Sequence, residues 1–108
     1  MYKRQDQLLS GRRLPSAVFA FSDEVALGAM RSLRRAGIEV PRQISVIGID
    51  DHPLAELTDL TTVAQDPVAL GRASAQVTLD LLRGRPVRDV GTFPTRLVVR
   101  GTTAPPTS

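Results

Sequence analysis

Two short apolar runs flank a segment with helical spacing, and this arrangement constrains the fold more than any other feature. Ala17–Phe21 reads A-V-F-A-F and Ile44–Ile49 reads I-S-V-I-G-I. Apolar runs of this length, bounded by turn residues, are typical of strands buried on both faces of a sheet. Asp23–Ala36 between them has a helical apolar pattern, with Ser22 as its expected N-cap. A strand–helix–strand unit with short connections predicts parallel strands. We therefore expect an α/β chain, a parallel sheet with flanking helices.

The second half of the chain continues the alternation. Leu54–Leu57 is expected to form a short helical turn and Thr61–Ala64 a third strand. Asp66 and the proline after it mark the start of a helix over Pro67–Arg83, because Asp is a favoured N-cap and Pro fits the first helical position. The apolar stripe of this helix comprises Leu70, Ala73, Val77 and Leu81. A last strand is expected over Arg96–Arg100.

Composition excludes several classes of protein. With 42% hydrophobic and 23% charged residues, the chain has the makeup of one ordered globular domain. The absence of cysteine excludes disulfides, zinc–thiolate sites and cysteine nucleophiles. No apolar run approaches the roughly 20 residues that span a membrane, and Met1–Leu9 has no secretory signal pattern. Residues 1–14 are expected to form a lead-in helix of a chain that begins inside a longer protein.

The basic charge does not by itself predict a nucleic-acid surface. The net charge is +3 and the isoelectric point about 10.5, but the arginines are spread along the whole chain. The tightest group, Arg31, Arg34 and Arg35, falls on the polar side of a predicted helix. Only 4% of the residues are aromatic, so no stacking platform for single strands is expected. We expect no direct contact between this chain and nucleic acid.

Polar residues follow each of the three predicted strands. Ser22 and Asp23 follow the first, Asp50 and its neighbour follow the second, and Gln65 follows the third. Parallel strands bring their carboxyl ends to one edge, where ligands of open α/β sheets bind. Carboxylate and carboxamide groups suit the hydroxyls of a polyhydroxylated ligand such as a sugar.

Each of these residues also has a purely structural interpretation. Ser22 and Asp66 are good N-caps, and for these two positions capping is the favoured interpretation. Asp23 fits the positive end of a helix dipole. Asp50 differs, because it follows an apolar strand and no helix with a clear pattern begins there, although acids at strand ends also close ordinary turns.

Other chemistry finds little support. His52, the only histidine, is adjacent to Asp50 and Asp51, and neighbouring residues point in different directions, so no metal site is expected. The patterns G-x-S-x-G, G-x-G-x-x-G and G-x-x-x-x-G-K-[ST] are absent. A phospho-acceptor receiver domain would need a lysine at a later strand end, and the only lysine is Lys3. We therefore expect neither an enzyme nor a cofactor.

Three segments together resemble a known family. Pro15–Asp51 (P-S-A-V-F-A-F-S-D-E-V-A-L-G-A-M, continuing to V-I-G-I-D-D), Thr61–Gly71 (T-T-V-A-Q-D-P-V-A-L-G) and Arg96–Pro106 (R-L-V-V-R-G-T-T-A-P-P) are similar to the effector-binding domain of LacI/GalR-type transcriptional repressors. The resemblance implies that residues 15–108 are a fragment of a type I periplasmic-binding-protein-like fold, from its C-terminal lobe. The helix over 67–83 would then be a crossover that packs on the N-terminal lobe.

The resemblance also implies roles for particular residues. Ser22 stands where the family has an effector-contacting Asn, and Asp23 completes that pair. Asp50 matches the ligand-binding aspartate of the G-[YF]-D-D motif, with Ile49 in place of the aromatic residue. Gln65 matches a position that lines the cleft near the hinge. The implied effector is a small molecule, a sugar or similar metabolite.

The resemblance further implies a cytoplasmic homodimer that contacts DNA only through a helix-turn-helix domain outside this chain and has no membrane contact. The small apolar stripe on the helix over 23–36 is expected to be mostly core but also suits contact between subunits. The expected interface residues are Val25, Ala26, Ala29, Met30, Leu54 and Leu57. Two alternatives remain at this point: a periplasmic sugar-binding protein of an uptake system, which shares the fold, and a hydrolase on an α/β sheet.

Overall fold

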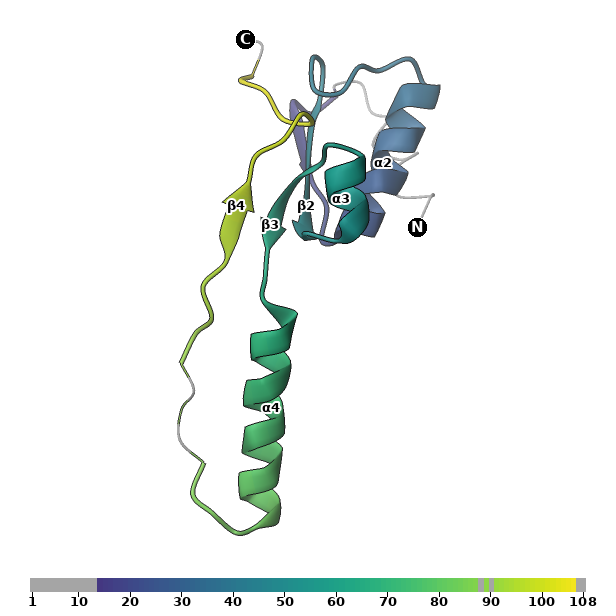
Figure 1. Cartoon of the computed structure of the whole chain (residues 1–108). Coiled ribbons are helices and arrows are strands. Elements are labelled where there is room, and N and C mark those ends of the chain that lie inside the picture. The colour runs from purple at the N-terminus through teal and green to yellow at the C-terminus, as the bar shows by residue number, and fades with distance from the viewer. Residues whose placement is uncertain (1–13, 88, 90, 107–108) are drawn as a thin grey trace. The chain divides into compact units, whose positions relative to one another are not determined.

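The computed structural model describes residues 14–87, 89 and 91–106 (Figure 1). It divides into two compact units, described separately: the first holds the described residues up to Ala64 and from Arg96 onward, and the second comprises Gln65–Thr95. The lead-in helix expected over 1–14 falls outside the described residues, apart from Leu14, which is not helical.

The first unit is built on a sheet of four strands in the order β1-β2-β3-β4. These strands are β1 (Ala17–Phe19), β2 (Ser45–Asp50), β3 (Thr61–Ala64) and β4 (Arg96–Val98). The first three are parallel, as predicted, but β4 is antiparallel to β3. The expected parallel sheet is therefore confirmed for β1, β2 and β3 and wrong for β4. A parallel neighbour needs a crossover that packs on the sheet, and the helix between β3 and β4 belongs to the second unit instead.

Helices α2 (Asp23–Arg35) and α3 (Pro53–Leu57) lie on the same side of the sheet (Figure 1). The core forms between these helices and the strands. It comprises Ala20, Ala26, Met30, Leu33, Ile44, Val46, Ala55 and Leu60, all buried. The apolar stripe of α2 thus faces the sheet, as its helical spacing predicts.

Both ends of α2 are capped as the sequence predicts. Ser22 Oγ accepts a hydrogen bond from the backbone N–H of Val25, with an N–O distance of 3.2 Å. At the other end Gly37 has φ 77, and Ile38 N–H donates to the carbonyl of Leu33 at 2.9 Å. This left-handed glycine and the backward hydrogen bond stop the helix. Glu39 follows in the loop after this cap. A hydrogen bond from the Arg42 side chain, and to a smaller extent the positive charge of Arg42, lowers the pKa of the Glu39 carboxyl group.

The face of the sheet opposite α2 is apolar and open to solvent among the described residues. Phe19 on β1 is 61% exposed and Leu97 on β4 is 58% exposed. The expectation that the first strand is buried on both faces was therefore wrong. β1 is an edge strand here, and both described helices of this unit cover the other face.

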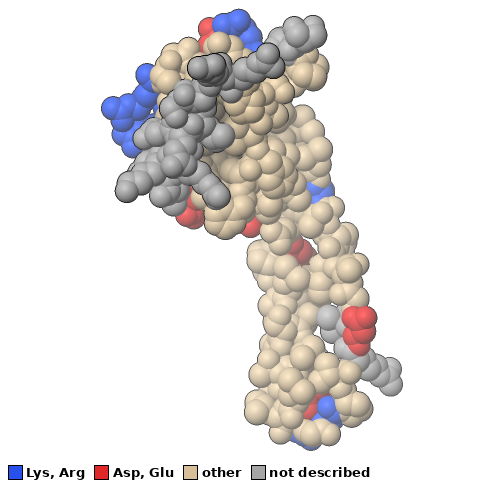
Figure 2. Space-filling view, turned by 180° about the vertical axis from the view of Figure 1, so that it is seen from behind, with Lys and Arg blue, Asp and Glu red and all other residues tan. Residues whose placement is uncertain are grey.

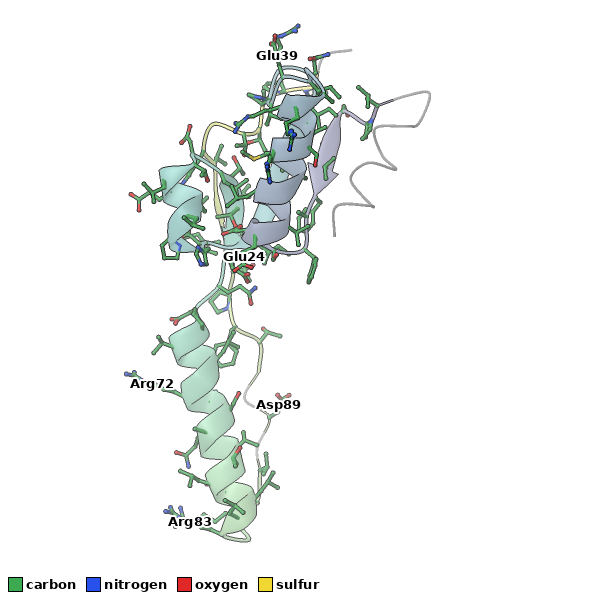
Figure 3. The ribbon with its side chains drawn as sticks, turned by 90° about the vertical axis from the view of Figure 1, so that its right-hand side faces the viewer. Glu24, Glu39, Arg72, Arg83 and Asp89 are labelled. Atoms are coloured by element: carbon green, nitrogen blue, oxygen red, sulfur yellow. The ribbon has the colours of Figure 1, made fainter. Side chains whose placement is uncertain are left out.

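The second unit contains helix α4 (Pro67–Leu82), which begins and ends within one residue of the prediction. Asp66 Oδ1 accepts from Ala69 N–H at 3.0 Å, so the predicted N-cap is confirmed. No residue of α4 is buried. Arg72 and Arg83 project away from the helix (Figure 3). The packing of α4 on another lobe stays a prediction.

Gly48 allows α2 to lie close to β2, and this predicts the effect of adding one methyl group. A Cβ at position 48 would lie 2.3 Å from Asp23 Oδ1 and 3.0 Å from the Asp23 Cα. We expect Gly48→Ala to lower the free energy of unfolding by about 1–3 kcal/mol, because helix backbone would have to move. Gly71→Ala is the matched control, since a Cβ there meets nothing within 4 Å. It should raise stability by about 0.5–1 kcal/mol, as alanine does inside an exposed helix. Urea unfolding measures both, and an unchanged stability in Gly48→Ala would contradict the close approach.

Candidate ligand-binding site

Three of the four predicted effector-binding residues lie at one edge of the first unit. Because β1, β2 and β3 are parallel, their carboxyl ends share an edge. Asp50 ends β2 directly beside Ala64, the last residue of β3. Ser22 and Asp23 begin α2 just after β1. Glu24, in the same first turn of α2, lies at the opposite end of this helix from Glu39 (Figure 3). The parallel strands therefore place Ser22, Asp23 and Asp50 at the same edge of the sheet, as the sequence predicts.

Asp50 is exposed and its backbone is strained. Its φ is 124 and that of Asp51 is 58, in the region that residues other than glycine rarely adopt. Asp and Asn tolerate the left-handed region of Asp51 better than most residues, whereas the φ of Asp50 lies beyond that region. Each such residue costs about 1–3 kcal/mol and persists only where the surroundings hold it. Such strain clusters at ligand sites. The turn after β2 thus begins with an exposed acidic residue in a backbone conformation that needs support.

The two adjacent acids have different surroundings. Asp51 Oδ1 accepts from Arg100 Nη2 at 2.9 Å, and this ion pair is largely shielded from solvent. Arg100 also donates through Nη1 to the carbonyl of Leu60 at 2.9 Å. Asp51 is therefore tied to the protein and partly buried, whereas Asp50 is exposed. Sequence reasoning missed Arg100, because nothing in the pattern around it points to a partner 49 residues away.

Asp23 is buried, with 1% of its surface exposed. Its Oδ2 accepts from the backbone N–H of His52 at 2.7 Å, and its Oδ1 accepts from Thr62 Oγ1 at 2.5 Å. The carboxylate therefore has partners inside the protein, in addition to its place in the first turn of α2. Its contact with an effector stays a prediction.

Ser22 and His52 both cap helices. The Ser22 Oγ that caps α2 keeps its hydroxyl hydrogen for another acceptor. His52 Nδ1 accepts from Leu54 N–H at 3.1 Å and so caps α3, with Pro53 in the first turn. The short helical turn expected over Leu54–Leu57 is thus confirmed as α3, and a histidine before proline was the overlooked signal for its cap. No cluster of three or more metal-ligating side chains occurs among the residues that the structure describes.

Gln65 is exposed and is the first residue of the second unit. Its approach to Asp50 at a common site therefore stays a prediction.

Half of the residues expected at a dimer interface belong to the core instead. Ala26, Ala29 and Met30 are 0–6% exposed, because this stripe of α2 faces the sheet, so they offer no surface to a second copy. Leu54 and Leu57 on α3 are exposed, at 42% and 80%. Val25 is half-buried. The exposed surface available for self-association in this set is therefore mainly that of α3.

Positive charge is dispersed on the face of the molecule shown in Figure 2. The arginines of the described residues form small groups there, with uncharged surface between them. A nucleic-acid footprint would favour a continuous basic stripe. None of the helices that the structure describes is long and apolar enough to cross a membrane.

The sequence matches the family of periplasmic binding protein-like domains over residues 1–103. The HTH-type transcriptional regulator MalR of Streptomyces coelicolor is 44% identical over 92 residues, which cover 82% of this chain and 27% of MalR. A LacI transcriptional regulator from a Rhodococcus species is similar in structure, with a TM-score of 0.83 and 35% identity over 96% of this chain and 39% of that one. A LacI family regulator from Enterococcus faecium with bound ribose gives a TM-score of 0.76 and 33% identity, over 98% of this chain and 40% of that one.

The chain therefore belongs to the periplasmic binding protein-like domain family. The resemblance to LacI/GalR-type regulators is confirmed, since the relatives and structural neighbours named above are transcriptional regulators. The chain spans about a quarter to two fifths of the length of these proteins.

Because the Asp50 backbone is strained, we expect glycine to be more stable than valine at this position, which is the reverse of the usual order in a strand. Asp50→Gly should be more stable than Asp50→Val by about 1–3 kcal/mol, because glycine adopts φ 124 freely and a β-branched residue does not. At Ile49, in regular strand, the order should reverse and valine should be the more stable residue. Urea unfolding of the four variants gives the comparison. The same order at both positions would show that the Asp50 backbone is not strained.

Proposed function

We propose that this chain is the C-terminal portion of the effector-binding domain of a one-component transcriptional regulator, and that Asp50 binds hydroxyl groups of a sugar or similar polyhydroxylated metabolite. The observation that carries the proposal is the exposed, strained Asp50 at the carboxyl edge of three parallel strands. A carboxylate accepts two or more hydroxyl hydrogen bonds at such an edge. The bound ribose of the Enterococcus faecium relative supports the choice of ligand class.

The proposed mechanism belongs to the complete protein. The effector binds between this lobe and another lobe outside the chain, with Ser22 and Gln65 as further contacts and α4 packed on the other lobe. No residue of α4 is buried, which supports a packing partner elsewhere. A ligand that binds one lobe arrangement more tightly shifts the population toward it. That shift changes the affinity of a helix-turn-helix domain, also outside the chain, for its operator.

The two alternative functions are less well supported. A sugar-binding protein of an uptake system shares the fold, but the relatives named above are transcriptional regulators. The same relatives give no support to an enzyme. A regulator works where its operator is, so we place the protein in the cytoplasm.

We also propose that the protein is a homodimer through this lobe. Leu54 and Leu57 form an exposed apolar surface on α3, with Val25 of α2 as the third residue expected there. Exposed apolar groups of this kind favour contact with a second copy. The buried residues of α2 support this surface from within.

The effector site is tested by removing one charge. In the complete regulator, Asp50→Asn keeps the size of the side chain and tolerates the same backbone, so the fold should persist. Its affinity should fall about 10- to 150-fold, as expected for hydrogen bonds to a charged acceptor. Isothermal calorimetry with a panel of ribose, glucose, maltose and lactose measures the loss. Glu39→Gln is the matched control, because it removes one negative charge at the far end of α2. Equal affinities in the wild type and Asp50→Asn would defeat the assignment.

The dimer surface is tested by introducing a charge. Leu57→Asp should weaken self-association of the complete regulator at least about tenfold, because a carboxylate would have to be buried at the interface. Sedimentation velocity over a range of concentrations measures the dissociation constant. Thr92→Asp adds the same charge at an exposed position of the second unit and should leave that constant unchanged. Undiminished association of Leu57→Asp would exclude α3 from the interface.

A further inference from the structure

We propose that Asp23 and Thr62 are positioning residues: without touching the ligand, they hold the turn Asp50–His52 in the conformation that presents the Asp50 carboxylate. This inference rests on the proposed function for its purpose but not for its geometry. It assigns to Asp23 a different role from the effector contact that the sequence suggested.

Hydrogen bonds lead from Asp23 to two consecutive backbone amides of the turn. Asp23 Oδ2 accepts from His52 N–H at 2.7 Å. Asp23 Oδ1 accepts from Thr62 Oγ1 at 2.5 Å, and the same hydroxyl accepts from Asp51 N–H at 3.3 Å. The residues immediately after Asp50 are therefore fixed by one buried carboxylate, directly and through one hydroxyl.

The surroundings of Asp23 are built for a charged group that stays in place. A buried carboxylate is costly unless it is hydrogen-bonded, and here both oxygens have donors. Asp23 also lies in the first turn of α2, where the helix dipole stabilises negative charge. Gly48 provides the space, because a side chain at that position would collide with Asp23 Oδ1. Thr62 is fully buried on the neighbouring strand and pairs with Gly48 in the sheet register.

The turn needs such an anchor because it is strained. Asp50 and Asp51 both have positive φ, and such conformations relax unless several contacts fix them. Arg100 holds the Asp51 side chain from outside the turn. Asp23 and Thr62 hold the backbone amides from inside. Without the inner anchor, the direction of the Asp50 carboxylate would no longer be fixed relative to the edge of the sheet.

A positioning role and a merely structural role make different predictions for Thr62→Val. Valine keeps the shape of threonine but removes the hydroxyl that joins Asp23 to Asp51 N–H. Thr62→Ser restores that hydroxyl. Thr102→Val is the matched control: Thr102 is 3% exposed, donates to the carbonyl of Val46 at 2.7 Å and accepts from Thr61 N–H at 2.9 Å. It removes equally buried hydrogen bonds that do not involve the turn.

The experiment uses the complete regulator and two measurements. Hydrogen exchange with mass spectrometry compares a peptide that contains Asp51 and His52 with a reference peptide from the carboxyl half of α2. Calorimetry measures affinity for ribose, glucose, maltose and lactose. In Thr62→Val the turn should exchange about tenfold faster relative to the reference, and affinity should fall about tenfold. Thr62→Ser should recover both to within about threefold, and Thr102→Val should leave the relative exchange of the turn unchanged.

Equal relative exchange in Thr62→Val and Thr102→Val would overturn the proposal, whether or not a sugar binds. Faster exchange of the turn with unchanged sugar affinity would also overturn it, because the turn would then not matter for binding. A wild-type protein that binds none of the four sugars, with exchange as predicted, would contradict the choice of sugar and leave the anchor established. Should Thr62→Val fail to fold, Asp23→Asn replaces it, since its amide nitrogen cannot accept from either donor.

Discussion

The close approach of α2 to β2 over Gly48 is the constraint on which the first unit depends. It brings the start of the helix so near the sheet that Asp23 lies inside the protein. Once inside, the carboxylate must find donors, and it finds them on the turn after β2 and on β3. One small residue thus couples the helix, two strands and a loop. The same approach brings Ala26 and Met30 of α2 into one buried cluster with Val46 of β2.

The sequence predicted the elements well because each has a strong local signal. The apolar runs, the caps at Ser22, Gly37 and Asp66, and the helical spacing of α2 are all properties of neighbouring residues. The direction of β4 (Arg96–Val98) was not predictable in this way, because so short a segment has the same pattern whether it pairs parallel or antiparallel. The exposure of β1 was also missed, because an apolar run does not reveal whether a strand lies at the edge or the centre of a sheet.

The location of the candidate site could be predicted from the sequence, but the hydrogen bonds that connect its residues could not. The strand–helix–strand pattern implies parallel strands, and parallel strands bring Ser22, Asp23 and Asp50 to one edge. An acid in the first turn of a helix, however, has the same sequence signature whether it is exposed or buried. The feature that makes room for the buried Asp23 is Gly48, and sequence patterns around Asp23 do not point to a residue so far along the chain. The different surroundings of Asp50 and Asp51 depend likewise on Arg100, which binds Asp51 from far along the chain.

The position of Arg100 and Thr102 late in the chain has a consequence for synthesis. Domains fold as they leave the ribosome, from the amino end onward. β1, β2 and β3 can pair as soon as residues up to 64 have emerged. Arg100, which binds Asp51, and Thr102, which binds the carbonyl of Val46, lie 49 and 56 residues after those partners. Until Arg100 is made, the Asp51 side chain lacks its ion-pair partner. A premature stop between these points would release a chain that holds all three parallel strands but not the arginine that helps to fix the turn at their carboxyl edge.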